Sequence, residues 1–364
     1  MDFDFTKLYK VFSIPANEYT VDRLQHGHIN TTFIVTVAGR PVFILQKINT
    51  SVFTDVDKLM DNYRLVTIAL SRFKWTKGFG LITPELIDTR DGKPFYSDSS
   101  KECWRLITYI DGADCTAVPH NIETAYQGGL AFGAFLKGVS EINPADLFQI
   151  LPDFHSLERR YNEFLKARES APSGRISLSE SEIDFVKRKH TSLINISGYL
   201  DSGAIPLRVV HNDTKLSNVI FATDGTFRGV IDLDTVMAGS TLFDFGDAIR
   251  SMANSACEDE TDITKVKFEI SLFEAFSKGY LKSAGSLLHK TETDLLAESA
   301  LFMTYIIGMR FLTDYLNGDI YFRTDYQTHN LVRAKNQFRM MEQMESEMAA
   351  MRAIIEKHRK LIGK

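Results

Sequence analysis

Three polar side chains of this sequence occur at intervals that suit one kind of chemistry. Asp213 and Asn218 lie five residues apart in the run HNDTKLSN, which interrupts two apolar stretches at 209–210 and 219–221. The residues that follow, VIFATDGTFRGVIDLD, predict two strands joined by a turn at Asp224 and Gly225. Such a hairpin returns Asp232 to the side of Asn218.

This arrangement indicates phosphoryl transfer. The reaction needs a carboxylate that orients the attacking hydroxyl and accepts its proton, and oxygen ligands that hold Mg²⁺ against the phosphates of a nucleotide. Asp213 fits the first role, and Asn218 with Asp232 fits the second. A lone loop Asp or Asn usually bonds nearby backbone groups, but here the HxDxxxxN spacing, the hairpin and the IDLD ending occur together.

A second sequence motif resembles a metal-binding motif but does not fit the expected hairpin. Asp244, Phe245 and Gly246 spell the DFG triplet of protein kinases, but they lie 26 residues after Asn218 and cannot end the hairpin that begins there. We therefore assign the metal to Asp232 and not to Asp244.

The elements around this loop predict an α+β fold with two lobes. Alternating apolar residues in 19–48 predict two successive hairpins, and 84–89 with 103–110 predict two further strands. Residues 54–73 have helical periodicity behind a possible Thr54 cap. We expect two lobes: an N-terminal lobe of five strands and one helix at 1–110, and a helical lobe at 111–364. The latter ends in one long helix over about 330–362.

Composition limits the partners. A formal charge of −5 and the absence of a basic run argue against nucleic-acid binding. Cys103, Cys115 and Cys257 match no disulfide or zinc spacing and are expected to be buried thiols in a reducing compartment. The acidic N-terminus is unlike a signal peptide, and the longest apolar stretch, near 300–312, is short and contains Arg310. We expect a cytoplasmic monomer or weak homodimer that binds a small molecule and no membrane.

The runs HNDTKLSN, IDLDTVMAG and FDFGDAIR resemble the aminoglycoside phosphotransferase and choline kinase superfamily. These are small-molecule kinases that use ATP and Mg²⁺ on a bilobal, protein-kinase-like fold. On this resemblance, 1–110 is the nucleotide-binding lobe and 111–364 is the catalytic and substrate-binding lobe. The resemblance implies Asp213 as the catalytic base and Asn218 and Asp232 as metal ligands. It also places Asp234 at a second acidic position near the metal and implies that Asp244 braces the catalytic loop.

A narrower resemblance covers nearly the whole chain. GHINTTFIVT, FILQKINTSVF, IPLRVVHNDTKLSN, GMRFLTDYLNGDIYF and HNLVRAKNQ are similar to segments of N-acetylhexosamine 1-kinases. This family implies phosphorylation of a sugar at its anomeric hydroxyl, with His28, Asp213, Arg310 and Tyr321 contacting the sugar. Without the resemblance, an Arg on an apolar helix such as Arg310 is more often an internal ion-pair partner.

The expected nucleotide site departs from the kinase pattern. Strand alternation places Gln46 where a phosphate-binding Lys is expected and turns Lys47 to the opposite face. The helix at 54–73 offers only Asp57 and Asp61 as partners for such a Lys.

The other nucleotide contacts are expected in two segments. Gly27 with the amides and hydroxyls of Thr31 and Thr32 can cover the phosphates, although a hairpin turn needs a Gly anyway. The connection TYIDG, with Tyr109, is expected to meet adenine.

Other functions remain open at this level. The same chemistry serves another sugar, a choline-like amine or an aminoglycoside, and the epimer preference between N-acetylglucosamine and N-acetylgalactosamine is not determined. A hydrolase that desulfates mucin sugars would carry a Cys-x-Pro-x-Arg or Ser-x-Pro-x-Arg signature, and neither string occurs. A catalytically dead binding module would lack one of Asp213, Asn218 and Asp232, and all three are present.

Overall fold

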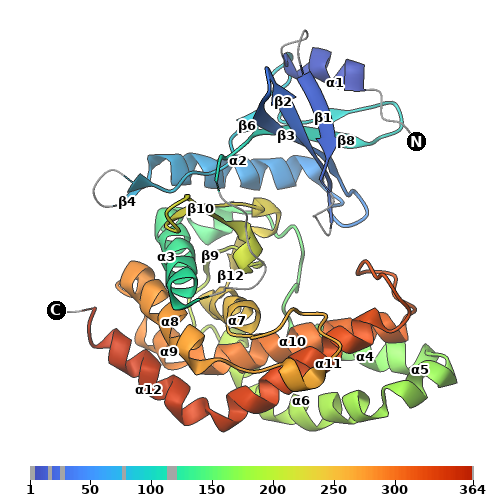
Figure 1. Cartoon of the computed structure of the whole chain (residues 1–364), viewed down its shortest axis with the longest axis vertical. Coiled ribbons are helices and arrows are strands. Elements are labelled where there is room, and N and C mark those ends of the chain that lie inside the picture. The colour runs from blue at the N-terminus through green and yellow to red at the C-terminus, as the bar shows by residue number, and fades with distance from the viewer. Residues whose placement is uncertain (1–4, 15–18, 25–28, 76–78, 113–120, 363–364) are drawn as a thin grey trace.

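The computed structural model describes residues 5–14, 19–24, 29–75, 79–112 and 121–362. It confirms a mixed α+β, bilobal kinase-like fold, with an antiparallel sheet in the N-terminal region and helices in the C-terminal portion (Figure 1). The boundary at residue 110 stays a prediction.

The N-terminal sheet follows the predicted hairpins. β1 (Tyr19–Arg23), β2 (Thr31–Val37), β3 (Arg40–Ile48), β8 (Cys103–Thr108) and β6 (Leu86–Ile87) are hydrogen-bonded in that order, and β7 (Tyr96–Ser97) pairs with β8. All these pairings are antiparallel. The sheet thus has one strand more than expected among the described residues, because the two-residue β7 is too short to show an alternating pattern.

Strand alternation gives the sheet two faces that pack against different parts of the molecule. Phe33, Val35 and Leu45 pack against helix α1 (Phe5–Phe12), which the sequence did not predict. Gln46, next to Leu45 in the chain, is opposite Arg105 of β8 in the register and lies on the other face. This second face points toward α2 (Val56–Arg72) and the rest of the molecule.

Helix α2 joins the sheet to the helical portion (Figure 1). Its first half packs Leu59 and Met60 beside the sheet, and its second half packs Val66 and Leu70 into the main helical core. The cap is Asp55, whose carboxylate accepts a hydrogen bond from the backbone N–H of Lys58 at 3.1 Å, and the expectation of a Thr54 cap was wrong. An ionised acceptor satisfies a helix N-terminus better than a hydroxyl does.

The C-terminal portion is built around closely packed helix pairs. α3 (Ile122–Gly138) crosses α8 (Ile270–Ala284) at glycines, and a Cβ added at Gly129 would lie 2.2 Å from the carbonyl oxygen of Phe276. Further α-helices precede the C-terminal segment: α4 (Leu157–Ser170), α5 (Ser173–Leu178), α6 (Glu180–Asp201), α7 (Thr241–Met252), α9 (Lys290–Asp294) and α10 (Leu296–Leu316).

The C-terminal segment forms two helices, not the single long helix that we expected. α11 (His329–Ser346) packs on α10, and α12 (Met348–Arg359) packs on α8. The chain turns at Glu347 so that one apolar face, with Met341 and Ile355 buried, stays against the globule along both helices.

Two pairs of short antiparallel strands lie between the sheet and the helices. β9 (Arg208–Val210) pairs with β12 (Met237–Gly239), and β10 (Val219–Phe221) pairs with β11 (Phe227–Val230). The predicted hairpin at 219–230 is confirmed, and its turn uses Gly225 at φ +83°, a left-handed conformation that suits Gly. The predicted catalytic loop leaves β9 and enters β10.

Of the cysteines, Cys103 is a buried free thiol as expected, but Cys257 is exposed. Cys257 lies in the loop after α7, where it borders a cavity instead of a core. Cys115 lies outside the described residues.

Candidate active site

The loop after β9 is anchored by a buried histidine. The His211 ring packs edge-on between Phe132 and Phe135, at centroid distances of 5.8 and 5.3 Å. Its Nε2 lies 3.0 Å from the carbonyl oxygen of Ile231, and its Nδ1 accepts a hydrogen bond from the backbone N–H of Asp213 at 3.3 Å. His211 therefore ties the loop to the hairpin that carries Asp232.

Two carboxylates of α7 hold the same loop. The backbone N–H groups of His211 and Asn212 donate to the two oxygens of Asp244, at 2.8 and 2.7 Å, and that of Thr214 donates to Asp247 at 3.0 Å. These bonds confirm that Asp244 braces the loop and does not end the hairpin. Burial raises the pKa of Asp244 to about 6, although the two N–H donors favour its charged form.

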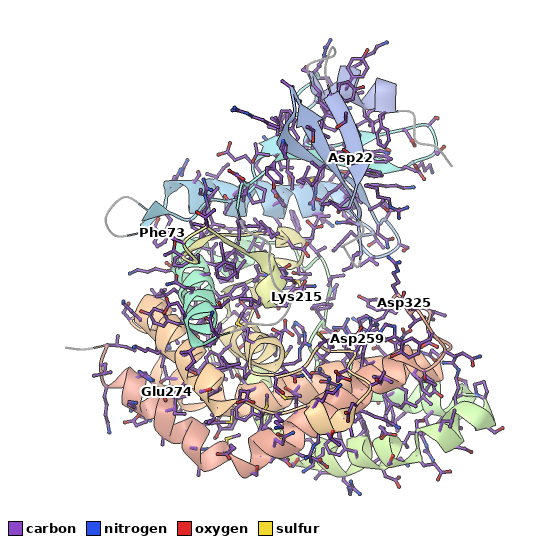
Figure 2. All side chains as sticks on the ribbon, in the orientation of Figure 1. Asp22, Phe73, Lys215, Asp259, Glu274 and Asp325 are labelled. Atoms are coloured by element: carbon purple, nitrogen blue, oxygen red, sulfur yellow. The ribbon has the colours of Figure 1, made fainter. Side chains whose placement is uncertain are left out.

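Asp213 lies among groups that stabilise its charge. Lys215 Nζ is 3.0 Å from its Oδ2, and the Asn218 side-chain amide donates to the same oxygen at 3.1 Å and to the Asp213 carbonyl at 2.8 Å. Burial alone would raise the pKa of Asp213, but Lys215, His211 and Asn218 outweigh burial and lower it. Asp213 is ionised at neutral pH and can accept a hydrogen bond from a substrate hydroxyl. Figure 2 shows Lys215 in the middle of the molecule, between the sheet and the long C-terminal helices.

Asp232 has the surroundings of a metal ligand. The backbone N–H of Ile231 donates to the carbonyl of Asn218 at 2.9 Å, so the hairpin brings Asn218 and Asp232 together as predicted. Asp232 has a φ of 63°, is exposed, and makes no hydrogen bond or ion pair with the described residues. Desolvation and the negative charges of Asp213 and Asp234 raise its pKa. A cation would relieve this repulsion, so the oxygens of Asp232 and Asn218 fit Mg²⁺.

Asp234 faces a residue that the sequence reading missed. Arg105 of β8, 1 % exposed, forms a two-pronged ion pair with its carboxylate, and the Nη2 to Oδ2 distance is 2.8 Å. Arg105 also donates to Gln46 Oε1 through Nε at 2.9 Å, stacks over the Tyr63 ring at 4.9 Å, and Asn30 donates to Asp234 at 2.6 Å. A single Arg in the otherwise apolar run CWRLIT was the available signal.

Lys47 lies on the opposite face of β3, as alternation predicted. Its ammonium pairs with Glu102. Asp57 and Asp61 of α2 are exposed. In this structure Arg105, next to Gln46, places a cation where the kinase pattern expects the β3 Lys.

The predicted phosphate-covering residues line a cavity of about 490 Å³ under β1 and β2. Its lining consists of Arg23, Leu24, Ile29, Asn30, Thr31, Thr32 and Arg323. Tyr109 follows β8, and its backbone N–H donates to the Val42 carbonyl at 2.9 Å. Gly27 and His28 lie outside the described residues.

A second cavity, of about 420 Å³, brings together Asp213, Arg310 and Tyr321. The Arg310 guanidinium stacks on the rings of Phe154, Tyr321 and Phe322 at 4.9, 5.6 and 5.5 Å. Within the described ranges it has no carboxylate partner and no hydrogen bond, and burial lowers its pKa to about 10. The ion pair that a lone Arg on an apolar helix would suggest is therefore not seen there.

Charges around this second cavity are unevenly paired. Asp213 pairs with Lys215, Asp247 and Glu258 share Arg250, and Asp259 lies 3.2 Å from the His329 ring, which is charged only when it is protonated. Arg310 and Arg333 have no carboxylate partner in the part of the chain that the structure describes. Four acids line the cavity against five basic side chains, Lys215, Arg250, Arg310, Arg323 and Arg333, so the lining has a formal charge of +1, which disfavours a cationic ligand.

The braced Asp–Asn loop, the hairpin that brings up Asp232 and the bilobal fold define a kinase-like phosphotransferase. Residues 20–285 match the model of the phosphotransferase enzyme family, and the chain belongs to this family. No helix in the described ranges is both long and apolar enough to cross a membrane.

Solved structures share the fold at low sequence identity. A microcompartment-associated aminopropanol kinase matches with a TM-score of 0.64 and 14 % identity, covering 96 % of this chain and 98 % of the other. The amicoumacin kinase hAmiN, in complex with AMP-PNP, Ca²⁺ and Ami, matches at 0.60 and 13 %, covering 93 % of each. Choline kinase of Cryptosporidium parvum Iowa II matches at 0.55 and 16 %, covering 93 % and 92 %.

Proposed function

We propose that this protein transfers the γ-phosphoryl group of ATP to the anomeric C1 hydroxyl of an N-acetylhexosamine. The observation that carries the proposal is the second cavity, where the ionised Asp213 and the unpaired Arg310 guanidinium share one lining. Asp213 supplies the carboxylate that phosphoryl transfer needs to orient the attacking hydroxyl. Arg310 supplies hydrogen-bond donors for a neutral carbonyl or hydroxyl group of the acceptor.

In the proposed reaction, Asp213 accepts a hydrogen bond from the C1 hydroxyl and orients its oxygen toward the γ-phosphorus. As the bond from this oxygen to phosphorus forms, the bond between the γ-phosphorus and the bridging oxygen breaks, ADP leaves, and Asp213 takes the proton. Lys215, 3.0 Å from Asp213, holds the carboxylate in place. Mg²⁺, held by Asn218 and Asp232 with Asp234 nearby, would neutralise charge on the nucleotide phosphates.

The nucleotide is proposed to bind on the N-terminal side of the site. Thr31 and Thr32 border the cavity under β1 and β2, and Gln46 lies beside Arg105 at the position of the missing Lys. We propose these residues, Gly27 and the segment around Tyr109 as contacts to ATP. The complex of hAmiN with AMP-PNP and Ca²⁺ supports a nucleotide and a divalent cation at this fold.

The acceptor is proposed to bind on the helical side. Arg310 can donate to the acetamide carbonyl, Tyr321 offers a ring face and a polar tip, and His28 is proposed to bond a sugar hydroxyl. An amino-alcohol or aminoglycoside acceptor is a weaker candidate, since it would bring a positive charge beside Arg310 and Arg333. Another neutral sugar is compatible with the same charges.

The test is a panel of acceptors with ATP and Mg²⁺: both N-acetylhexosamines, glucose, galactose, choline and an aminoglycoside, with the phosphate position read by ³¹P NMR. We expect phosphate at C1 of an N-acetylhexosamine, with kcat/KM at least roughly tenfold above the sugar without the acetamide, about 1.4 kcal/mol of discrimination. Phosphate at C6, or preferred turnover of choline or the aminoglycoside, would contradict the proposal and leave the family assignment intact.

A further inference from the structure

The second cavity, which we call the acceptor cavity because the acceptor is proposed to bind there, is lined in part by residues of α10 and α11. The two helices approach closely at Gly308, where an added Cβ would lie 2.6 Å from the Phe338 ring and 3.0 Å from the Gln337 Cβ. Gln337 is one helical turn after Arg333, and both line the cavity that contains Asp213 and Arg310. The cavity is therefore lined by Gln337 of α11 and by Arg310 of α10.

Gln337 is a buried amide with an unused acceptor. Its side chain is 1 % exposed, and Oε1 has no hydrogen-bond partner within the described ranges. Leaving a buried polar atom without a hydrogen-bond partner is unfavourable, and native proteins rarely retain one without a reason. The same cavity contains two more such atoms, Nε of Arg333 and Nδ1 of His155.

Gln343 of the same helix shows how a structural glutamine is satisfied. Its Nε2 donates to the carbonyl of Val266 at 2.8 Å, and its Oε1 accepts from the backbone N–H of Phe268 at 3.0 Å. Both bonds fasten a neighbouring loop to α11. Gln337 makes no such bonds to the residues that the structure describes, so a structural role in fastening a loop does not account for its amide.

We propose that Gln337 is a substrate-binding residue that reads a secondary amide of the acceptor. Its Oε1 accepts the amide N–H, while an arginine of the same cavity, Arg310, donates to the amide carbonyl. A secondary amide has its N–H and its carbonyl on opposite sides, so selective binding needs one acceptor and one donor. The cavity supplies both, from adjacent helices. This inference rests on the proposed function. It identifies Gln337 as the residue by which the enzyme distinguishes an amide from an ester or a hydroxyl.

The test uses three acceptors that differ at one position: N-acetylglucosamine, 2-O-acetylglucose, which keeps the carbonyl but lacks the N–H, and glucose. Gln337→Met removes the acceptor atom at similar volume, and Gln343→Met is the control on the same helix. We expect wild-type kcat/KM for the amide to exceed that for the ester by roughly tenfold. Gln337→Met removes this ratio by raising KM for the amide alone. Gln343→Met lowers the unfolding temperature and keeps the ratio.

The outcomes separate the two claims. If the wild type phosphorylates neither the amide nor its C4 epimer, the proposed function fails and this inference fails with it. If the wild type prefers the amide and Gln337→Met keeps the preference, only the inference fails. If the Met variant does not fold, Gln337→Asn replaces it, because its side chain is one methylene shorter and places the amide out of reach of the acceptor. It should lower the ratio of amide to ester turnover in the same way. ATP-dependent thermal shifts verify that each variant is folded.

Discussion

At the scale of single residues, the proposed chemistry depends on how neighbours set each charge. Asp213 is ionised because Lys215 and Asn218 contact its carboxylate. For Asp232, desolvation and the negative charges of Asp213 and Asp234 outweigh the positive charges of Lys215 and Arg105, so its pKa is raised. These opposite shifts fit the roles that we propose, a hydroxyl-orienting base for Asp213 in the loop and a cation ligand for Asp232 at the end of the hairpin.

Replacing Asp213 by Asn should lower kcat by roughly 10²–10⁴-fold, because the variant keeps the shape of the side chain and loses the proton acceptor. Nucleotide affinity should change little, since Asp213 lines the acceptor cavity. Steady-state kinetics and nucleotide titration of the same preparation measure both quantities. Near-normal kcat would exclude Asp213 as the orienting base.

His155, in the wall of the acceptor cavity, predicts a pH dependence of stability. It is buried, its Nε2–H donates to the Asn212 carbonyl at 3.3 Å, and burial together with the nearby charge of Arg310 lowers its pKa to about 3. In the unfolded chain the His155 ring takes up a proton as the pH falls below its ordinary pKa of about 6.5, whereas in the folded chain it stays neutral there. The stabilising contribution is therefore complete above pH 6.5 and is lost as the pH falls, by up to about 1.4 kcal/mol per pH unit.

His155→Gln keeps an N–H for the Asn212 carbonyl and removes the titration. Urea unfolding at pH 7, 6, 5 and 4.5 should show a shallower loss of free energy of unfolding in the variant than in the wild type. Parallel curves for the two proteins would mean that His155 is protonated in the folded state.

At the scale of elements, the hairpin and α7 each carry an Asp that a sequence motif marks as a metal ligand. Asp232 ends the hairpin without partners among the described residues, while Asp244 is buried and accepts two backbone N–H groups. The two residues therefore contribute to different properties, which substitution can separate.

Asp232→Ala should leave the free energy of unfolding nearly unchanged and abolish Mg²⁺-dependent nucleotide binding. Asp244→Ala should lower the free energy of unfolding by about 2–4 kcal/mol, because it leaves two buried N–H donors unpaired. Denaturant titrations and nucleotide binding with and without Mg²⁺ measure both effects. A stable Asp244→Ala that loses metal binding, beside an Asp232→Ala that keeps it, would reverse our assignment.

At the scale of the whole molecule, the ion pair of Arg105 and Asp234 joins the sheet to the catalytic region. Arg105 comes from β8, Asp234 from the turn after the hairpin, and Gln46 of β3 completes the contact. Lys47, one residue further along β3, pairs with Glu102 at the surface. The cation that reaches the site is thus supplied by a neighbouring strand.

Arg105→Met should lower the free energy of unfolding by about 3–5 kcal/mol, since it leaves the Asp234 charge buried and unpaired. The double variant with Asp234→Leu should recover much of this stability, because apolar pairs can replace buried ion pairs, yet should still bind ATP weakly. Lys47→Met is the matched control, with a loss below about 1 kcal/mol and normal ATP affinity. Normal ATP affinity in the double variant would limit this pair to a structural role.

The local parts of the fold and site were predictable from the sequence. Alternation assigned Gln46 and Lys47 to opposite faces of β3, and turn residues assigned the hairpin that brings Asp232 to Asn218. Both depend on interactions within a few residues or between adjacent strands, which leave a periodic pattern in the chain. Capping at Asp55 and the turn at Glu347 were missed because several nearby residues satisfy the same local pattern.

Only the tertiary structure decided which distant groups meet. Arg105 and Asp234 are 129 positions apart, and no periodicity links them. The missing partner of Arg310 and the unused acceptor of Gln337 are likewise properties of a cavity lined by segments from across the chain. Burial and pairing depend on everything packed around a side chain. The sequence therefore predicted the Asp–Asn loop, and the packing of segments from across the chain determined which side chains line the cavity beside it.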